Sequence, residues 1–184
     1  MMLSPPIASV EKAAEKAAEK AVIERTAVFD RSQNYRYWLG RRWQKGGAQV
    51  AFVMLNPSRA DDTHDDPTLR ACIQFAQRWE YSALSVVNLF GYRTPHPAML
   101  KKADNPVGPQ NDEYVLKAVT EAQQVVLAWG NWGSLGGRDR AILTLLRPHQ
   151  PKLTYLQMNR SGQPRHPLYI SRDRPLRSFT LPAS

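Results

Sequence analysis

Short runs of consecutive apolar residues recur along the middle of the chain. Three of them, at 49–55, 83–90 and 124–129, lack the polar alternation of a half-exposed strand. Such runs are typical of strands that are buried on both faces. A shorter run at 153–156 predicts a fourth strand of this kind, and the aromatic alternation at 35–39 predicts another strand before them.

Segments with helical periodicity lie between these runs. One helix is predicted to begin at Pro67 with Asp66 as its N-cap, and others are predicted over 111–122 and 138–146. Strands that alternate with helices indicate an α/β fold. We expect three layers, α/β/α, in which a mostly parallel central sheet of about four strands carries an N-terminal edge hairpin formed by the first two strands.

The start of the chain differs in composition from the rest. Residues 11–20 repeat Glu-Lys-Ala-Ala, which favours helix but offers only alanine as an apolar face. We therefore expect residues 1–26 to form a helical or disordered arm. Residues 27–184 are expected to form a single α/β domain with a basic C-terminal tail, since the length suits one domain.

Charge suggests a partner for this domain. The 25 Lys and Arg residues exceed the 16 Asp and Glu residues, for a formal net charge of +9. Such a balance favours polyanions, so the expected partner is nucleic acid, specifically DNA.

Apolar runs and cysteine content indicate the compartment. No apolar run approaches the ~20 residues that a membrane span needs, so we expect no membrane contact. The single cysteine, Cys72, excludes an internal disulfide and fits a cytoplasmic location. Its apolar helical context predicts a buried side chain, and we expect no cofactor and no metal. The oligomeric state stays open.

Three of the predicted buried strands end in polar clusters. They are Asn56-Pro57-Ser58, the stretch from Asn88 to Arg93, and Gly130-Asn131-Trp132-Gly133. Ligands of open α/β sheets bind at the carboxyl ends of the strands. We therefore expect these clusters, which are far apart in sequence, to meet in one pocket.

Two short motifs resemble those of the uracil-DNA-glycosylase-like superfamily. Met54-Leu55-Asn56-Pro57-Ser58 is similar to its Gly-x-Asn-Pro-Gly motif, and His166-Pro167-Leu168 is similar to its late His-Pro-Ser motif. Ser58 replaces the second glycine, and Leu168 replaces the serine. These departures bear on how closely the backbone approaches a base and on the loop that enters the DNA.

The chain more closely resembles an uncharacterised bacterial and phage domain family, described only as a domain of unknown function, over roughly residues 34–170. Leu55-Asn56-Pro57-Ser58, Asp65-Asp66-Pro67-Thr68 and Asn88-Leu89-Phe90 carry this resemblance. We interpret the family as a distant branch of the glycosylase-like superfamily, which implies a uracil-DNA-glycosylase-like fold.

The glycosylase resemblance implies roles for individual residues. Asn56 would orient a water against the sugar C1′, and His166 would stabilise the leaving base. Asn88 would bond the edge of an extruded base. The full candidate set is Asn56, Asp61, Asp65 and His166 for catalysis, Pro57, Ser58, Asn88, Phe90, Tyr92, Arg93 and Asn131 for substrate binding, and Arg59, Arg160 and Arg165 for the nucleic-acid backbone.

The acidic loop at 61–66 offers a different chemistry. Its carboxylates could bind Mg²⁺ for a hydrolytic reaction. Asp61 or Asp65 could instead be the general base, because the neutral amide of Asn56 is too weak to deprotonate water. The simpler interpretation is a solvated loop in which Asp66 caps a helix, and the lack of regular metal-ligand spacing favours it.

Three functions follow from these patterns. The leading hypothesis is metal-free hydrolysis of the N-glycosidic bond of a damaged or modified base. The second is non-catalytic binding of nucleic acid or a nucleotide, which the Ser58 and Leu168 departures motivate. The third is a Mg²⁺-dependent hydrolase that uses the acidic loop. The first hypothesis requires that the Asn-Pro turn and the His-Pro segment line the same cleft.

Overall fold

A seven-stranded sheet forms the centre of the molecule in the computed structural model, which describes residues 22–181. The order of its strands is β1-β2-β4-β3-β5-β6-β7. The strands are β1 (Glu24–Phe29), β2 (Arg36–Arg42), β3 (Gln49–Met54), β4 (Ala83–Asn88), β5 (Gln124–Leu127), β6 (Leu153–Tyr155) and β7 (Arg177–Ser178). The α-helices are α2 (Pro67–Arg78), α3 (Asn111–Glu121) and α4 (Arg138–Leu145), and the 3₁₀ segments are η1 (Pro97–Lys101), η2 (Asn131–Gly137), η3 (Arg147–Lys152) and η4 (Pro167–Tyr169).

The sheet is mixed, so the prediction of a mostly parallel sheet of about four strands is wrong. Strands β4, β3, β5 and β6 are parallel to one another, but β1–β2, β2–β4 and β6–β7 pair antiparallel. Only the broad α/β class holds. Two strands escaped prediction, because β1 begins with exposed polar residues and β7 has two residues, too few for any periodicity.

The predicted edge hairpin also has the wrong members. The strand expected at 35–39 does not pair with the strand at 49–55; β2 pairs with β1 on one side and with β4 on the other. Leu39 of β2 lies opposite Val86 of β4. The buried run of β4 has two neighbours in the sheet, and β2 satisfies the backbone groups on the side that β3 leaves open.

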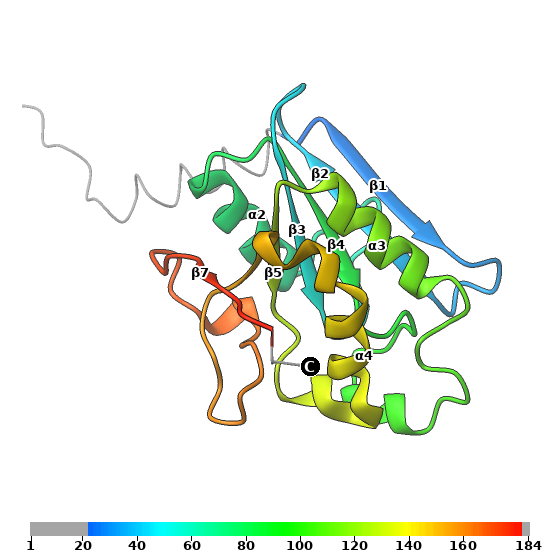
Figure 1. The fold of residues 1–184 in the computed structure, drawn as a ribbon. Coiled ribbons are helices and arrows are strands. Elements are labelled where there is room, and N and C mark those ends of the chain that lie inside the picture. Colours follow the sequence, from blue (N-terminus) through cyan, green and yellow to red (C-terminus); the bar gives the residue numbers. More distant parts are fainter. Residues whose placement is uncertain (1–21, 182–184) are drawn as a thin grey trace, which may run out of the picture.

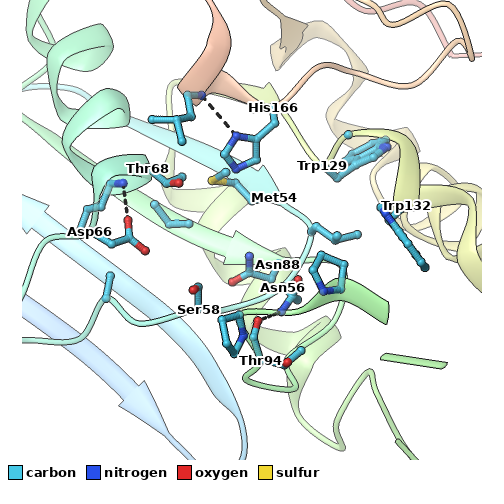
Figure 2. A pocket seen from close by; sticks show the side chains of 18 of the residues that line it. Met54, Asn56, Ser58, Asp66, Thr68, Asn88, Thr94, Trp129, Trp132 and His166 are labelled. Carbon is cyan, nitrogen blue, oxygen red and sulfur yellow. Dashed lines mark hydrogen bonds between the residues drawn. The ribbon is translucent and has the colours of Figure 1, made fainter. Parts of the chain in front are cut away.

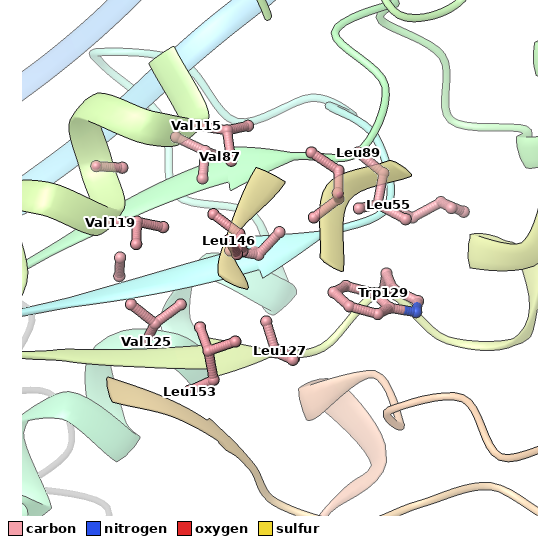
Figure 3. Packing of buried hydrophobic residues seen from close by; sticks show 14 of the residues in the cluster. Leu55, Val87, Leu89, Val115, Val119, Val125, Leu127, Trp129, Leu146 and Leu153 are labelled. Atoms are coloured by element: carbon pink, nitrogen blue, oxygen red, sulfur yellow. The ribbon is translucent and has the colours of Figure 1, made fainter. Parts of the chain in front are cut away.

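Helices cover both faces of the sheet (Figure 1). Alternating residues of β3 divide between two cores: Ala51 and Val53 pack with α3 and α4, whereas Val50 and Phe52 pack with α2. Figure 3 shows the first core, in which residues of β4, β5 and β6 meet those of α3. Because these strands are buried on both faces, their sequences lack polar alternation.

Helix α2 follows the predicted local rules. The carboxylate of Asp66 accepts the Leu69 N–H at 2.8 Å, and Pro67 occupies the first turn, where no N–H is needed. The helix turns Cys72 and Phe75 into the core. Burial raises the pKa of the Cys72 thiol, so the side chain acts as a small apolar residue, which confirms the prediction.

The first strand crosses the expected end of the N-terminal arm, since β1 begins at Glu24. The repeat at 11–20 lies outside the described residues. Within residues 22–181, no helix combines the length and the hydropathy that crossing a bilayer requires.

Candidate functional site

The carboxyl ends of β3, β4 and β5 open onto a pocket of about 580 Å³ (Figure 2). The three strands are parallel and in register, so the residues that follow them reach the same edge of the sheet. Segment 159–169 closes the pocket from the C-terminal part of the chain. The polar side chains that line it belong to Arg36, Asn56, Ser58, Asp66, Thr68, Asn88, Thr94, Asn131, Asn159, Arg165 and His166.

The side chain of Asn56 has a fixed orientation. Its Nδ2 donates to the carbonyl of Thr94 at 2.7 Å and to that of Pro57 at 3.0 Å. A carbonyl can only accept, so these contacts assign the amide nitrogen to the Thr94 side. Oδ1 therefore remains as the atom of this amide that can accept a hydrogen bond from a ligand or a water.

Asn88 lies at the end of β4 and is 2% exposed. Arg36 Nη2 approaches its Oδ1 at 3.5 Å, a long contact, while Arg36 Nη1 donates to the carbonyl of Ala60 at 2.6 Å. The guanidinium has only donors, so Asn88 turns its Oδ1 toward Arg36 and keeps its Nδ2 for the pocket. A ligand at this position meets a donor.

Arg36 is a buried cation at the pocket wall and was missing from the sequence-based set. Its place in the aromatic run at 35–39 predicted a position in a strand and nothing more. Burial lowers its pKa to about 10, and the nearby charge of Asp66 opposes this shift. The group therefore stays protonated at neutral pH and supplies a permanent positive charge beside Asn88.

Among the carboxylates of the acidic loop, only that of Asp66 lines the pocket. Its Oδ1 accepts the Leu69 N–H, so the helix cap fixes the side chain and leaves the second oxygen for other contacts. From the sequence, Asp66 was predicted as a helix cap or as one of the loop carboxylates that could bind Mg²⁺, not as a residue of this pocket. The cap and a place in the pocket are compatible, because a carboxylate can accept hydrogen bonds at both oxygens.

His166 faces the pocket as a neutral donor. Its Nδ1 accepts the Leu168 N–H at 3.3 Å, so the proton of the neutral ring resides on Nε2. Burial lowers the pKa of His166, and the charge of Asp66 partly opposes the shift. In Figure 2, His166 and Asn56 lie on opposite sides of the same cavity.

Aromatic and apolar groups complete the walls. Trp129 and Trp132 lie on the side away from Asp66 (Figure 2). Trp129 is buried and donates from Nε1 to Gln163 Oε1 at 2.6 Å. Gly130 adopts a φ of 73°, and its N–H donates to the Pro164 carbonyl at 2.7 Å, which fastens the end of β5 to the segment that carries His166.

Asp61 and Asp65, the expected general bases, do not line the pocket. Asp65 pairs with Arg41 at 2.8 Å and with Arg25 at 2.7 Å, and the Arg41 side chain is fully buried. Asp61 accepts hydrogen bonds from the hydroxyl and N–H of Thr63 and from the N–H of His64, and these hold its pKa well below the ordinary range. Both carboxylates therefore organise the loop.

Three other candidates pack away from the pocket. Phe90 is 3% exposed and belongs to the core with α3. Tyr92 meets Tyr35 edge to face, with ring centroids 5.9 Å apart. Arg93 donates to the Gln33 carbonyl at 2.9 Å, and its guanidinium lies 4.6 Å from the Phe29 ring centroid.

The remaining candidates lie in or beside the pocket. Ser58, Asn131 and Arg165 line it, and Asn131 Oδ1 accepts from Asn159 and from Ser161. Pro57 is buried, and its carbonyl accepts the Thr94 N–H. Arg59 and Arg160 are exposed next to lining residues. In the part of the chain that the structure describes, no three His, Cys, Asp or Glu side chains are grouped to hold a metal ion.

Comparison with known proteins gives one result. The model of a protein family described as "Protein of unknown function (DUF1643)" matches residues 36–168, which include every element around the pocket except the last residue of η4. No curated protein and no solved structure matches the chain.

Proposed function

Because the chain belongs to the DUF1643 family of proteins of unknown function, its activity has to be inferred from the pocket, and we propose that the pocket holds a nucleobase of DNA and hydrolyses its N-glycosidic bond. The observation that carries the proposal is the meeting of Asn56, Asn88 and His166, from three distant segments, in one cavity. The likeness of two of these segments to glycosylase motifs supports the same chemistry.

The size and lining of the pocket suit a base. A volume of about 580 Å³ falls in the ordinary range for small-molecule sites. Trp129 and Trp132 offer aromatic surface, while Asn88 Nδ2 and His166 Nε2 offer donors. These donors would pair with the exocyclic oxygens of a base. A base without such oxygens would leave the buried donors unpaired, so its binding would be disfavoured.

Asn56 and Asp66 position and activate the attacking water in the proposed reaction. Asn56 Oδ1 orients the water, and the free oxygen of Asp66 accepts its proton. The water oxygen then forms a bond to the sugar C1′ as the bond from C1′ to the base nitrogen breaks. The electron pair leaves with the base, whose negative charge the His166 and Asn88 donors stabilise. The proton held by Asp66 finally neutralises the released base.

The test separates the carboxylate's chemistry from its structural role. Oligonucleotides that contain uracil, hypoxanthine or another modified base are incubated with the protein, and alkali then reveals abasic sites as strand breaks. Asp66→Asn keeps a good N-cap but removes the base, so we expect an unchanged unfolding transition and a loss of base release of roughly 10²-fold or more. Asn56→Ala is expected to lose release as well.

Asp62→Asn provides the matched control. Asp62 is exposed in the same loop and does not line the pocket, so this variant is expected to release base at the wild-type rate. Absence of abasic product from every oligonucleotide would contradict hydrolysis. Full activity of Asp66→Asn would remove Asp66 from the mechanism.

The other two hypotheses differ in what supports them. Non-catalytic binding keeps the same pocket and would appear in this test as salt-sensitive DNA binding without product. A magnesium hydrolase has less support, because Asp61 and Asp65 do not line the pocket and each uses Oδ1 in contacts within the loop or with arginines.

A further inference from the structure

We propose that the mouth of the pocket binds single-stranded DNA by stacking bases on Trp132 and Tyr169. The inference rests on the proposed function in taking DNA as the partner, and it adds the strandedness of that partner and the residues that grip it. It depends on three observations: where exposed apolar side chains lie, which cations surround them, and what the pocket requires of its ligand.

Most of the exposed large apolar side chains lie at or next to the pocket. Among residues 22–181 they are Ile23, Met99, Trp132 and Tyr169. Trp132 and Tyr169 line the pocket, at 37% and 74% exposure, and Met99 belongs to η1, whose Pro97 also lines it. Apolar groups concentrated around an opening mark a contact surface more than a scatter of single residues does.

The two rings are presented outward. Tyr169 meets only His166 among aromatic neighbours in the described residues, with centroids 6.2 Å apart and the planes tilted by 45°. Lys101 Nζ lies 5.0 Å from the Trp132 ring centroid. The rings come from different elements, η4 and η2, so a strand entering the pocket can meet one before the base and one after it.

Four cations line this opening, contact a residue that lines it or adjoin such a residue in sequence; we call Arg59, Lys101, Arg160 and Arg165 the mouth cations. Arg165 lines the pocket, Lys101 covers Trp132, and the other two adjoin lining residues. None of the four forms an ion pair with a residue in the described range, whereas Arg41, Arg42 and Arg138 are each paired with a carboxylate. Unpaired positive charges interleaved with aromatic rings match a polyanion that carries flat bases.

A duplex does not fit this surface as well as a single strand. Bases in a duplex stack on one another, so their faces are not available to Trp132 and Tyr169. A base can also enter the pocket only after it leaves its pair, and a single strand has no pair to break. An apolar protein partner would use the rings but not the four unpaired cations.

The test measures binding, not turnover. Fluorescence anisotropy compares a labelled oligonucleotide of about 20 unmodified nucleotides, longer than the ~4–16 that an OB-fold domain covers, with its duplex. We expect tighter binding of the single strand. Trp132→Ala and Tyr169→Ala should each weaken it by roughly fivefold or more, because one stacked base is lost, while Trp132→Phe and Tyr169→Phe should retain most of the affinity.

Ile23→Ala is the matched control. It removes an exposed apolar side chain beside β1, away from the pocket, and is expected to leave the affinity unchanged. Equal or tighter binding of the duplex overturns the inference, and so does wild-type affinity in both alanine variants. If no oligonucleotide binds, the inference fails.

The two proposals can fail separately. Ring-dependent binding of the single strand without abasic product retains the inference and removes the hydrolysis. Abasic product together with ring-independent binding retains the hydrolysis and removes the inference.

Discussion

Arg36 is a charged side chain that is buried in the wall of the pocket. It is 4% exposed, and its guanidinium binds the Ala60 carbonyl and faces Asn88 and Asp66. Buried charges of this kind are stabilising only when every donor and its counter-charge are in place. Arg36 therefore joins the folding of β2 to the shape of the pocket.

Arg36→Met tests this connection. Methionine fills much of the volume but leaves the Ala60 carbonyl and Asn88 Oδ1 without their donor. We expect the free energy of unfolding to fall by about 1–3 kcal/mol, measured by chemical denaturation. Arg42→Met in the same strand is the control, since Arg42 is partly exposed and lies 3.5 Å from Glu24, so its loss should cost little. Equal losses in both variants would contradict a special role for Arg36.

The residues of the pocket were unequally predictable. Asn56 directly follows an apolar run, Asn88 lies near the end of another, and Asn131 is separated by one residue from a third. Their place at the edge of the sheet could therefore be inferred from sequence. Arg36 could not, because the sequence does not say which buried strand faces it. Asp66 was predicted as a cap or as part of a metal-binding loop, since a local pattern indicates a residue's neighbours in sequence but not what lies across a cavity.

At the scale of elements, the acidic loop at 61–66 acts as a brace between β2 and α2. Asp65 pairs with Arg41 of β2, the carbonyl of Asp61 also accepts from Arg41, and Asp66 caps α2. The loop thereby fixes the start of α2 against the sheet, and Asp66 reaches the pocket as a consequence. The carboxylates whose density suggested a metal site instead pair with arginines and accept hydrogen bonds from backbone N–H groups of the loop and of α2.

Asp65→Ala should therefore act on stability. It leaves the Arg41 guanidinium buried without its carboxylate, and loss of one partner of a buried pair typically costs about 3 kcal/mol. We expect the midpoint of urea denaturation to fall accordingly. Asp62→Ala, exposed in the same loop, should leave the midpoint unchanged. An Asp65→Ala protein with wild-type stability and no activity would return Asp65 to the list of catalytic candidates.

The individual strands and helices differ in how well they could be predicted from their sequences. The four parallel strands and the three helices fall on apolar runs and periodic segments. β1 begins with Glu24, Arg25 and Thr26, all exposed, so it carries no apolar pattern at its start. Strand β1 forms because it pairs with β2, and the pairing of two strands cannot be predicted from the sequence of either strand alone.

At the scale of the whole molecule, strand order decides the site. The chain visits the sheet in the order β1, β2, β3, β4, but β4 lies between β2 and β3. This exchange places Asn88 beside both Arg36 and the end of β3. Apolar patterns predict that strands exist, whereas their order depends on long-range packing that no short segment contains, which is why the mixed sheet was not foreseen.

The net charge of +9 is also a property of the whole molecule, and it predicts that the affinity for DNA depends on the salt concentration. If the four mouth cations each neutralise one phosphate, log Kd for single-stranded DNA should rise with log salt concentration at a slope of about 3, and Arg160→Glu should lower the slope by about 1. Arg147→Glu changes the net charge equally but lies in η3, outside the pocket, and should preserve the slope. Equal slopes in both variants would indicate binding through diffuse charge alone.

Segment 159–169 contributes Arg165, His166 and Tyr169 to a pocket whose first lining residue along the chain is Arg36. A chain growing on the ribosome therefore completes most of the sheet before the cavity has its last wall. The nascent protein can bury most of its two cores, which lack only Ile170 and Leu181 among their buried residues, before the pocket has its last wall. A ligand that needs the whole pocket can therefore bind only after synthesis has passed Tyr169.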